Sequence, residues 1–315
     1  MEDWVSKRGL TLIDSRRLKE LSVRSDARGL AQLGSQLGAI AVTGILLASS
    51  WGSWWGVPVF IAHGILINCL YAGQHEMSHW TAFKSRWLNE VAGEAIGFVV
   101  IYPFIWDRWF HFTHHRNTQS WEKDPELLIR APYTFGSYLL NLFGVSYWYG
   151  RMRSTIRLAF GIAPPYAYWL NEKQRRTVIV EARWHVAGYL AIAALSLAFG
   201  SWAAIKFWLA PMLLTKVVHQ LQNVGEHTCL THEPDVLKNT RTLKGPLLMR
   251  WLMWNMSYHT AHHNFPGVPF HRLGELHREI EERLGAPVPT GGYLETHATI
   301  ARTLWRDADE LEPVR

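Results

Sequence analysis

The chain has 315 residues, of which 48% are hydrophobic and only 18% charged, and its formal net charge is +6. This composition excludes an intrinsically disordered chain. Its two cysteines, Cys69 and Cys229, exclude a disulfide scaffold or an iron–sulfur cluster held by this chain alone. The 32 lysines and arginines are spread over several polar segments without a dense run, which argues against a nucleic-acid partner.

The N-terminal segment, residues 1–32, starts with polar residues of both charge signs and lacks the apolar run typical of a signal peptide, so we expect it to be cytoplasmic. Two uncharged runs of 18 residues follow, at 33–50 and 57–74, and the tryptophan-rich sequence WGSWWG separates them. About 20 apolar residues cross the ~30 Å hydrocarbon core of a bilayer, and tryptophan favours its interface. The pattern predicts a hairpin of two transmembrane helices.

A shorter apolar stretch, residues 93–106, contains 14 residues, including Glu94 and Pro103. That length favours a re-entrant or interfacial element over a full span. Two later runs, 184–202 and 203–221, predict a second transmembrane hairpin. Two lysines, Lys206 and Lys216, lie in the last run, and we expect their amines to reach the membrane interface.

Lysine and arginine counts predict the topology. Segments 1–30, 75–183 and 222–315 hold 7, 13 and 10 of these residues, whereas the hairpin turns hold almost none, so all three segments are placed in the cytoplasm. We therefore predict an all-α integral membrane protein with four transmembrane helices arranged as two hairpins. A helical cytoplasmic cap would hold a histidine-rich dimetal site in the domain 33–285, and a cytoplasmic helix and tail, 286–315, would follow. The expected location is the bacterial inner membrane, with both termini and the active site cytoplasmic.

Eight of the 16 histidines fall into three clusters, HEMSH (75–79), HFTHH (111–115) and HTAHH (259–263). Residues i, i+3 and i+4 share one face of a helix, so each cluster projects its imidazoles in one direction. Neutral imidazole is the commonest metal ligand, and eight rings exceed the needs of one ion. The clusters predict two metal ions, with iron, zinc, copper(II) and nickel as the metals that imidazole suits. The predicted ligands are His75, His79, His111, His114, His115, His259, His262 and His263.

The three clusters, their order and the two predicted hairpins resemble the membrane fatty acid desaturase superfamily over residues 35–285. The sequence NMSYHTAHHNFPGVPFHRL (255–273) is similar to the family's Tyr-His-x-x-His-His-x-Phe-Pro run. The first cluster has three residues between its histidines, whereas acyl-CoA desaturases typically have four. In this respect the chain resembles the bacterial branch.

The resemblance implies a centre of two iron ions held almost wholly by histidine, with O2 as co-substrate. It also implies a ninth ligand, His227, and a water-mediated role for Asn223, both in NVGEH (223–227). Because the chain has no dinucleotide-binding fingerprint, electrons are expected from a ferredoxin-, rubredoxin- or cytochrome b5-like donor. No catalytic residue apart from the metal ligands and no organic cofactor site is predicted.

Ligating imidazoles usually donate their second N–H to a carboxylate or a carbonyl oxygen. Several polar residues lie close enough to the clusters in sequence to take this role, although a solvated or helix-capping role fits them equally well. They are Glu76, Asp107, Asp124, Glu226 and Asn255.

The predicted function is O2-dependent oxidation of an unactivated C–H bond in a lipid-like substrate, with acyl-lipid desaturation as the default. Hydroxylation, ketolation or oxidative decarboxylation of a fatty acid, carotenoid or small amphiphile remains open, because the clusters do not distinguish these outcomes. The alternative from another class is a non-catalytic membrane metal-binding or transport protein. Transport needs ligands near the membrane midplane, where only His63 fits.

Overall fold

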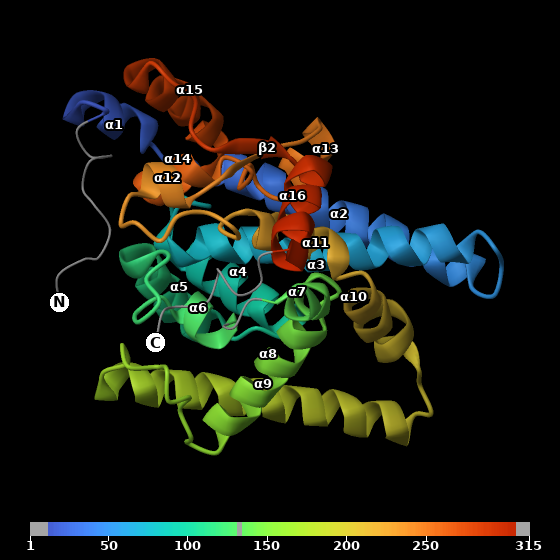
Figure 1. The fold of residues 1–315 in the computed structure, drawn as a ribbon. Coiled ribbons are helices and arrows are strands. Elements are labelled where there is room, and N and C mark those ends of the chain that lie inside the picture. Colours follow the sequence, from blue (N-terminus) through green and yellow to red (C-terminus); the bar gives the residue numbers. More distant parts are fainter. Residues whose placement is uncertain (1–11, 131–133, 307–315) are drawn as a thin grey trace.

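The computed structural model describes residues 12–130 and 134–306, and these are mostly helical, as predicted (Figure 1). Two short strands, β1 (Thr242–Lys244) and β2 (Thr290–Gly292), pair in parallel with Thr242 opposite Thr290. The helices in chain order are α1 (Ser15–Leu21), α2 (Asp26–Ser50), α3 (Gly56–Ser78), α4 (Arg86–Val99), α5 (Phe104–Asn117), α6 (Pro125–Arg130), α7 (Phe135–Leu142), α8 (Val145–Ala159), α9 (Glu172–Ala198), η2 (Ile205–Leu209), α10 (Ala210–Leu214), α11 (Val217–Gly225), α12 (Val236–Asn239), α13 (Leu247–Leu252), α14 (His259–Asn264), η3 (Phe270–Arg272), α15 (Leu273–Leu284) and α16 (Tyr293–Arg306).

Helices α2 and α3 coincide with the first predicted hairpin. Their 25 and 23 residues correspond to about 38 Å and 35 Å of helix, enough to cross a ~30 Å hydrocarbon core. The surface of α2 is mostly exposed, whereas half of the apolar window of α3 is buried, because α3 packs against α2, α4, α5 and α10. Helix α3 is therefore the central element, and its C-terminal end carries the first histidine cluster.

The second predicted hairpin is regular only in its first helix. Helix α9 starts at a capping box formed by Asn171 and Gln174 and is long and apolar enough to span a membrane. The predicted span 203–221 is not one helix, which corrects the sequence-based expectation. It is divided into the π-helical η2, then α10, a break at Thr215 and Lys216, and α11.

Pro211 is the physical reason for part of this irregularity. Proline has no N–H, so in a regular helix the carbonyl of Phe207 would lose its partner four residues ahead. His63 Nε2 lies 2.9 Å from that carbonyl oxygen, and His63 Nδ1 lies 2.8 Å from Thr43 Oγ1. His63 therefore has a structural role. Gly64 allows this close approach, since a Cβ there would lie 2.1 Å from the Pro211 carbonyl oxygen.

The expectation that Lys206 and Lys216 both reach the interface is wrong for Lys216. Its side chain is only 1% exposed and lies in the protein interior. Lys206 is partly exposed near the turn after α9, where its amine lies 4.9 Å from the ring centroid of Trp51.

Residues 93–106 do not form a straight span, as expected. Helices α4 and α5 meet at an angle of 101°, and Pro103 immediately precedes α5. Glu181 of α9 accepts hydrogen bonds from the backbone N–H groups of Ile105 (2.6 Å) and Trp106 (3.0 Å). A carboxylate at this position accepts hydrogen bonds from free N–H groups in the first turn of α5, and its negative charge interacts favourably with the positive end of the helix dipole. The bend gives α5, which carries the second histidine cluster, a direction different from that of α4.

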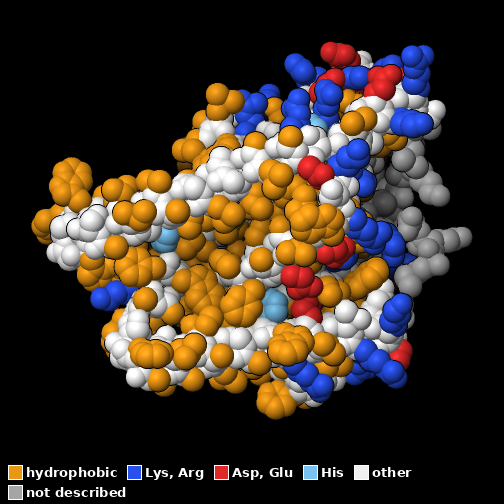
Figure 2. Space-filling model, turned by 180° about the vertical axis from the view of Figure 1, so that it is seen from behind, with side chains coloured by type: hydrophobic (Ala, Val, Ile, Leu, Met, Phe, Trp, Pro, Cys, Tyr) orange, Lys and Arg blue, Asp and Glu red, His pale blue; other side chains and the backbone are white. Residues whose placement is uncertain are grey.

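Charged and apolar side chains are separated along the molecule. Both hairpin turns, residues 51–55 and 199–204, lie toward the same end in Figure 1. Figure 2 shows lysine, arginine, aspartate and glutamate gathered toward the opposite end, while apolar side chains cover the rest of the visible face. The exposed apolar side chains on α2 and α9 include Leu46, Leu190 and Leu197. This division is the one expected for a protein whose apolar part lies in a bilayer.

An ion-pair network at the charged end joins α1 to α15 and gives a testable pH dependence. Arg17 Nη2 lies 2.5 Å from carboxylate oxygens of both Glu275 and Glu279. Hydrogen bonds from Arg17 and Arg272 lower the pKa of Glu275. A carboxyl with a lowered pKa in the folded state stabilises that state above its unfolded pKa of about 4.3, and this contribution is lost as the pH falls through the folded pKa.

We therefore expect the attachment of α1 to weaken as the pH falls below about 4, and Glu275→Gln to weaken it already at pH 7. Hydrogen exchange of residues 15–21, corrected for the intrinsic pH dependence, should be up to about fivefold faster in this variant, the range of a surface ion pair. Glu282→Gln on the same helix is the control. Equal exchange in the wild type and in Glu275→Gln would show that the network does not hold α1.

Candidate dimetal centre

The structure brings all nine predicted histidines together in two adjacent groups. In each group, one ring nitrogen from every member lies within 4.8 Å of the others. The five-histidine group consists of His75, His79, His111, His115 and His262. The four-histidine group consists of His114, His227, His259 and His263. The rings of His115 and His263 stack between the groups with centroids 4.1 Å apart.

Helix periodicity distributes each cluster between the groups. On α5, His111 and His115 are four residues apart and point to the same group, while His114 is turned toward the other. On α14, His262 belongs to the first group, and His259 and His263, again four residues apart, belong to the second. The end of α3 supplies only the five-histidine group, and His227 directly follows α11 and belongs to the four-histidine group.

The spacing of the ring nitrogens fits metal coordination. Ligands about 2.1 Å from an ion at right angles to each other are ~3.0 Å apart. In the five-histidine group, His115 Nε2 lies 2.8 Å from His111 Nε2 and 3.1 Å from His262 Nε2. In the other group, His227 Nε2 lies 2.9 Å from His259 Nε2 and 3.2 Å from His114 Nε2.

Buried nitrogens without a protein partner support the same conclusion. Both ring nitrogens of His75, Nε2 of His79 and Nε2 of His263 are buried and make no hydrogen bond within the described residues. Burial holds the pKa of His259, His262 and His263 well below its usual value, so these rings are neutral and have a free lone pair. The residues therefore fit two bound transition-metal ions.

Oxygen atoms from the surrounding protein face the outer nitrogens of the four-histidine group. Three of these contacts are hydrogen bonds: His114 Nδ1 to Asp124 Oδ1 (2.9 Å), His227 Nδ1 to the Asn239 carbonyl (3.1 Å) and His263 Nδ1 to Thr118 Oγ1 (3.2 Å). In the fourth, His259 Nδ1 lies 3.2 Å from Glu226 Oε1 without the geometry of a hydrogen bond. An Nδ1–H that donates outward leaves the Nε2 lone pair facing inward, toward a metal. The Nδ1 atoms of His115 and His262 in the other group have no such partner within the described residues.

Of the five neighbouring polar residues considered from sequence, only Asp124 and Glu226 contact ligand histidines. The Glu76 carboxylate accepts from Thr81 Oγ1 (2.7 Å) and the Phe270 N–H (3.0 Å), and so links α3 to the segment after the third cluster. The Asp107 carboxylate accepts from Tyr71 and Gln74, and the Asn255 amide donates to the Phe270 carbonyl. The expectation that Glu76 and Asn255 orient the ligands receives no support from these contacts.

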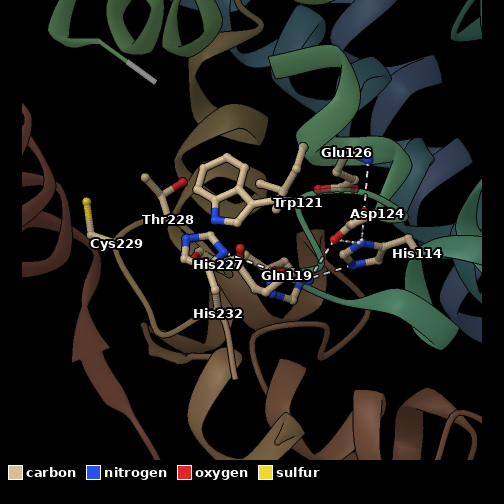
Figure 3. Close-up of a pocket in the computed structure, with 10 residues that line it drawn as sticks. His114, Gln119, Trp121, Asp124, Glu126, His227, Thr228, Cys229 and His232 are labelled. Carbon is tan, nitrogen blue, oxygen red and sulfur yellow. Dashed lines mark hydrogen bonds and ion pairs between the residues drawn. The ribbon is translucent and has the colours of Figure 1, made fainter. Parts of the chain in front are cut away.

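Three residues in contact with the four-histidine group were not anticipated: Thr118, Gln119 and Asn239. Gln119 donates to the His227 carbonyl and lies in a pocket beside the group (Figure 3). Trp121 stacks on His232 in the same pocket, with ring centroids 4.3 Å apart. Nothing in their residue types predicts these contacts. Thr118 and Gln119 meet histidines more than 100 positions away, and Asn239 uses its backbone carbonyl, which any residue has.

A second pocket opens directly on histidines of both groups. Its lining includes His75 and His111 of one group and His114, His227 and His259 of the other. Asn223 lies in the same lining, as does the aromatic ring of Tyr71. This position is compatible with the water-mediated role expected of Asn223.

Comparison with known proteins identifies the family. The family model described as fatty acid desaturase matches residues 49–290. The chain belongs to the fatty acid desaturase family. It is 24% identical over 268 residues to the sn-1 oleoyl-lipid 12-desaturase of Picosynechococcus sp., covering 79% of this chain and 76% of the relative. It is also 27% identical to the sphingolipid delta(4)-desaturase of Drosophila melanogaster (78% and 73% covered) and to the dihydrorhizobitoxine desaturase of Bradyrhizobium elkanii (80% and 74%).

This desaturase is therefore an integral membrane oxidoreductase that acts in lipid desaturation or a related oxidation. Family membership decides against the non-catalytic transport protein considered from sequence. The structure agrees. That alternative depended on His63, and both ring nitrogens of His63 are hydrogen-bonded, to Thr43 Oγ1 and to the Phe207 carbonyl.

Proposed function

We propose that the nine histidines hold two iron ions and that the desaturase uses them with O2 to oxidise an unactivated C–H bond of a lipid-like substrate, with acyl-lipid desaturation as the default. The observation that carries this proposal is the convergence of nine imidazoles in two groups, in which buried nitrogens of His75, His79 and His263 have no hydrogen-bond partner among the described residues. Bound iron would supply O2 activation, which no amino-acid side chain provides.

The protein's own part is to position neutral ligands and to exclude water. Eight of the nine histidines are buried, and His115 is partly exposed. Nine neutral imidazoles bring no negative charge to the ions. Asp124 and Glu226, behind His114 and His259, are the carboxylates positioned to offset part of that charge. A closed site also keeps bulk water from competing with the C–H bond of the substrate.

The proposed substrate class is inferred from the names of the relatives and from the membrane fold. The relatives are named for oleoyl-lipid, sphingolipid and dihydrorhizobitoxine desaturation. A small amphiphile is the second candidate substrate. Hydroxylation, ketolation or oxidative decarboxylation, including that of a carotenoid, would need the same centre and a different placement of the carbon to be oxidised.

We further propose that the charged end of the molecule faces the cytoplasm of a bacterial cell and meets the electron donor there. The histidine clusters lie at the opposite end of α2 and α3 from the hairpin turn, and the lysines and arginines gather toward the same end (Figure 2). A basic face attracts an acidic ferredoxin-, rubredoxin- or cytochrome b5-like protein. Turnover that does not depend on ionic strength would contradict this electrostatic docking.

The function is tested by expressing the chain in a bacterial host without this activity and analysing its lipids and free amphiphiles by mass spectrometry. Elemental analysis of the purified protein accompanies this measurement. We expect about two iron ions per chain and a product two hydrogens lighter than its precursor. In His259→Ala the product should be absent and about one iron ion per chain should remain, in the five-histidine group. A product with one added oxygen would shift the assignment to hydroxylation. Zinc alone in active protein would contradict the iron proposal.

A further inference from the structure

Lys216 is a buried lysine that pairs with no carboxylate of the described residues. It lies at the break between α10 and α11, and its side chain is 1% exposed. Its amine lies 3.8 Å from the ring centroid of Tyr147, 5.2 Å from Trp148 and 6.0 Å from Tyr71. Within residues 12–130 and 134–306, no ion pair to Lys216 is formed. Gly144, with φ +79°, lets the chain close over it, since a Cβ there would lie 2.8 Å from the lysine side chain.

A second cation, Arg151 of α8, shares this environment. Its guanidinium lies over the ring of Tyr102 and 4.8 Å from the ring centroid of Tyr147, which is also the nearest ring to Lys216. A neighbouring carboxylate, Asp107, accepts hydrogen bonds from Tyr71 (3.2 Å) and Gln74 (3.0 Å) and pairs with neither cation. Two basic side chains therefore lie around the same aromatic ring.

This arrangement is unfavourable for the protein alone. Burying a charged amine costs several kcal/mol unless an opposite charge and hydrogen bonds replace its hydration. Contact with a tyrosine ring replaces only part of the lost hydration. An anionic group between the cations would supply the missing interactions.

The aromatic ring of Tyr71 separates the two basic side chains from the histidine pocket. Tyr71 lies between Lys216 and the pocket that contains His75, His111 and His259, because its ring both faces the amine and lines that pocket. His219, in the same lining, packs against the edge of the Tyr71 ring with centroids 5.1 Å apart. A molecule that met the cations at one end could therefore reach the histidine pocket with its other end.

We propose that Lys216 and Arg151 bind an anionic oxygen group, a carboxylate or a phosphate, of an amphiphilic substrate whose apolar part reaches the histidine pocket. This inference rests on the proposed function for the identity of the histidine pocket. It restricts the substrate class, because an anion held so close to the histidines requires a short separation between the anionic group and the oxidised carbon.

The test measures binding of three ten-carbon probes to the full chain in detergent: decanoate, decyl phosphate and methyl decanoate. Lys216→Met removes the charge and keeps a chain of similar length, which suits the apolar surroundings. Lys206→Met, on the same broken segment but beside Trp51, is the matched control. We expect Lys216→Met to weaken decanoate or decyl phosphate binding by about tenfold or more, the effect of a lost charged hydrogen bond. Methyl decanoate should bind equally to all three proteins.

The tighter of the two anions identifies the group that the site prefers. Equal binding of the ester and both anions to the wild type, or unchanged anion binding in Lys216→Met, would overturn the inference. Metal content is measured on the same samples. Metal-free protein with Lys216-dependent anion binding would contradict the dimetal proposal alone, whereas two metals per chain without that dependence would contradict only the anion site.

Discussion

Exchange of His263 for alanine is expected to empty the four-histidine group and abolish turnover, whereas exchange of His262 leaves a metal in the five-histidine group. The reason is the number of ligands that remain. Loss of His263 leaves three imidazoles, and its Nε2 is one of the buried nitrogens without a protein partner. Loss of His262 leaves four, which is a complete set for a four-coordinate ion.

The measurement is metal per chain by elemental analysis, with iron-57 Mössbauer spectroscopy to tell a single ion from a coupled pair. We expect about one ion per chain in His263→Ala and about two in His262→Ala. His271→Gln, a histidine outside both groups, is the control for general effects of losing an imidazole. Two ions retained in His263→Ala would show that the four-histidine group does not hold metal.

Asp124→Asn is expected to weaken metal binding in the four-histidine group by about 10–100-fold, the usual effect of removing the partner behind a ligating histidine. The Asp124 carboxylate is 1% exposed and accepts from His114 Nδ1 and from the backbone N–H groups of Gln119 and Glu126. An asparagine keeps the shape but presents only one acceptor oxygen, so His114 loses a fixed orientation and the charge behind it.

Glu76→Gln is the matched control, since Glu76 is equally buried and lies in the first cluster but binds Thr81 and Phe270 instead of a histidine. The Glu76→Gln variant should have a lower thermal stability than the wild type and the same metal affinity. Competition with a chelator of known affinity measures both variants. A larger loss of affinity in Glu76→Gln than in Asp124→Asn would show that metal binding follows the packing of the clusters and not the hydrogen bond to His114.

Several features were predictable because they depend on local periodicity. The hairpin of α2 and α3 follows from two long uncharged runs, and the bend before α5 follows from Pro103 in a run too short to span. Histidines three or four residues apart must share a face once the segment is helical. The break of residues 203–221 into several helices has a tertiary cause, because His63 and Gly64 of α3 accommodate the irregular backbone around Pro211.

The sequence by itself determined that the protein is helical, that its histidines can converge and which of them are candidates, since these properties need only composition and helix geometry. Only the tertiary structure decided how nine histidines divide into groups of five and four, because each group combines residues from separate helices. It also selected Asp124 and Glu226 over Glu76, and it placed Lys216 in the interior. These outcomes depend on which surfaces pack together, and no local pattern carries that information.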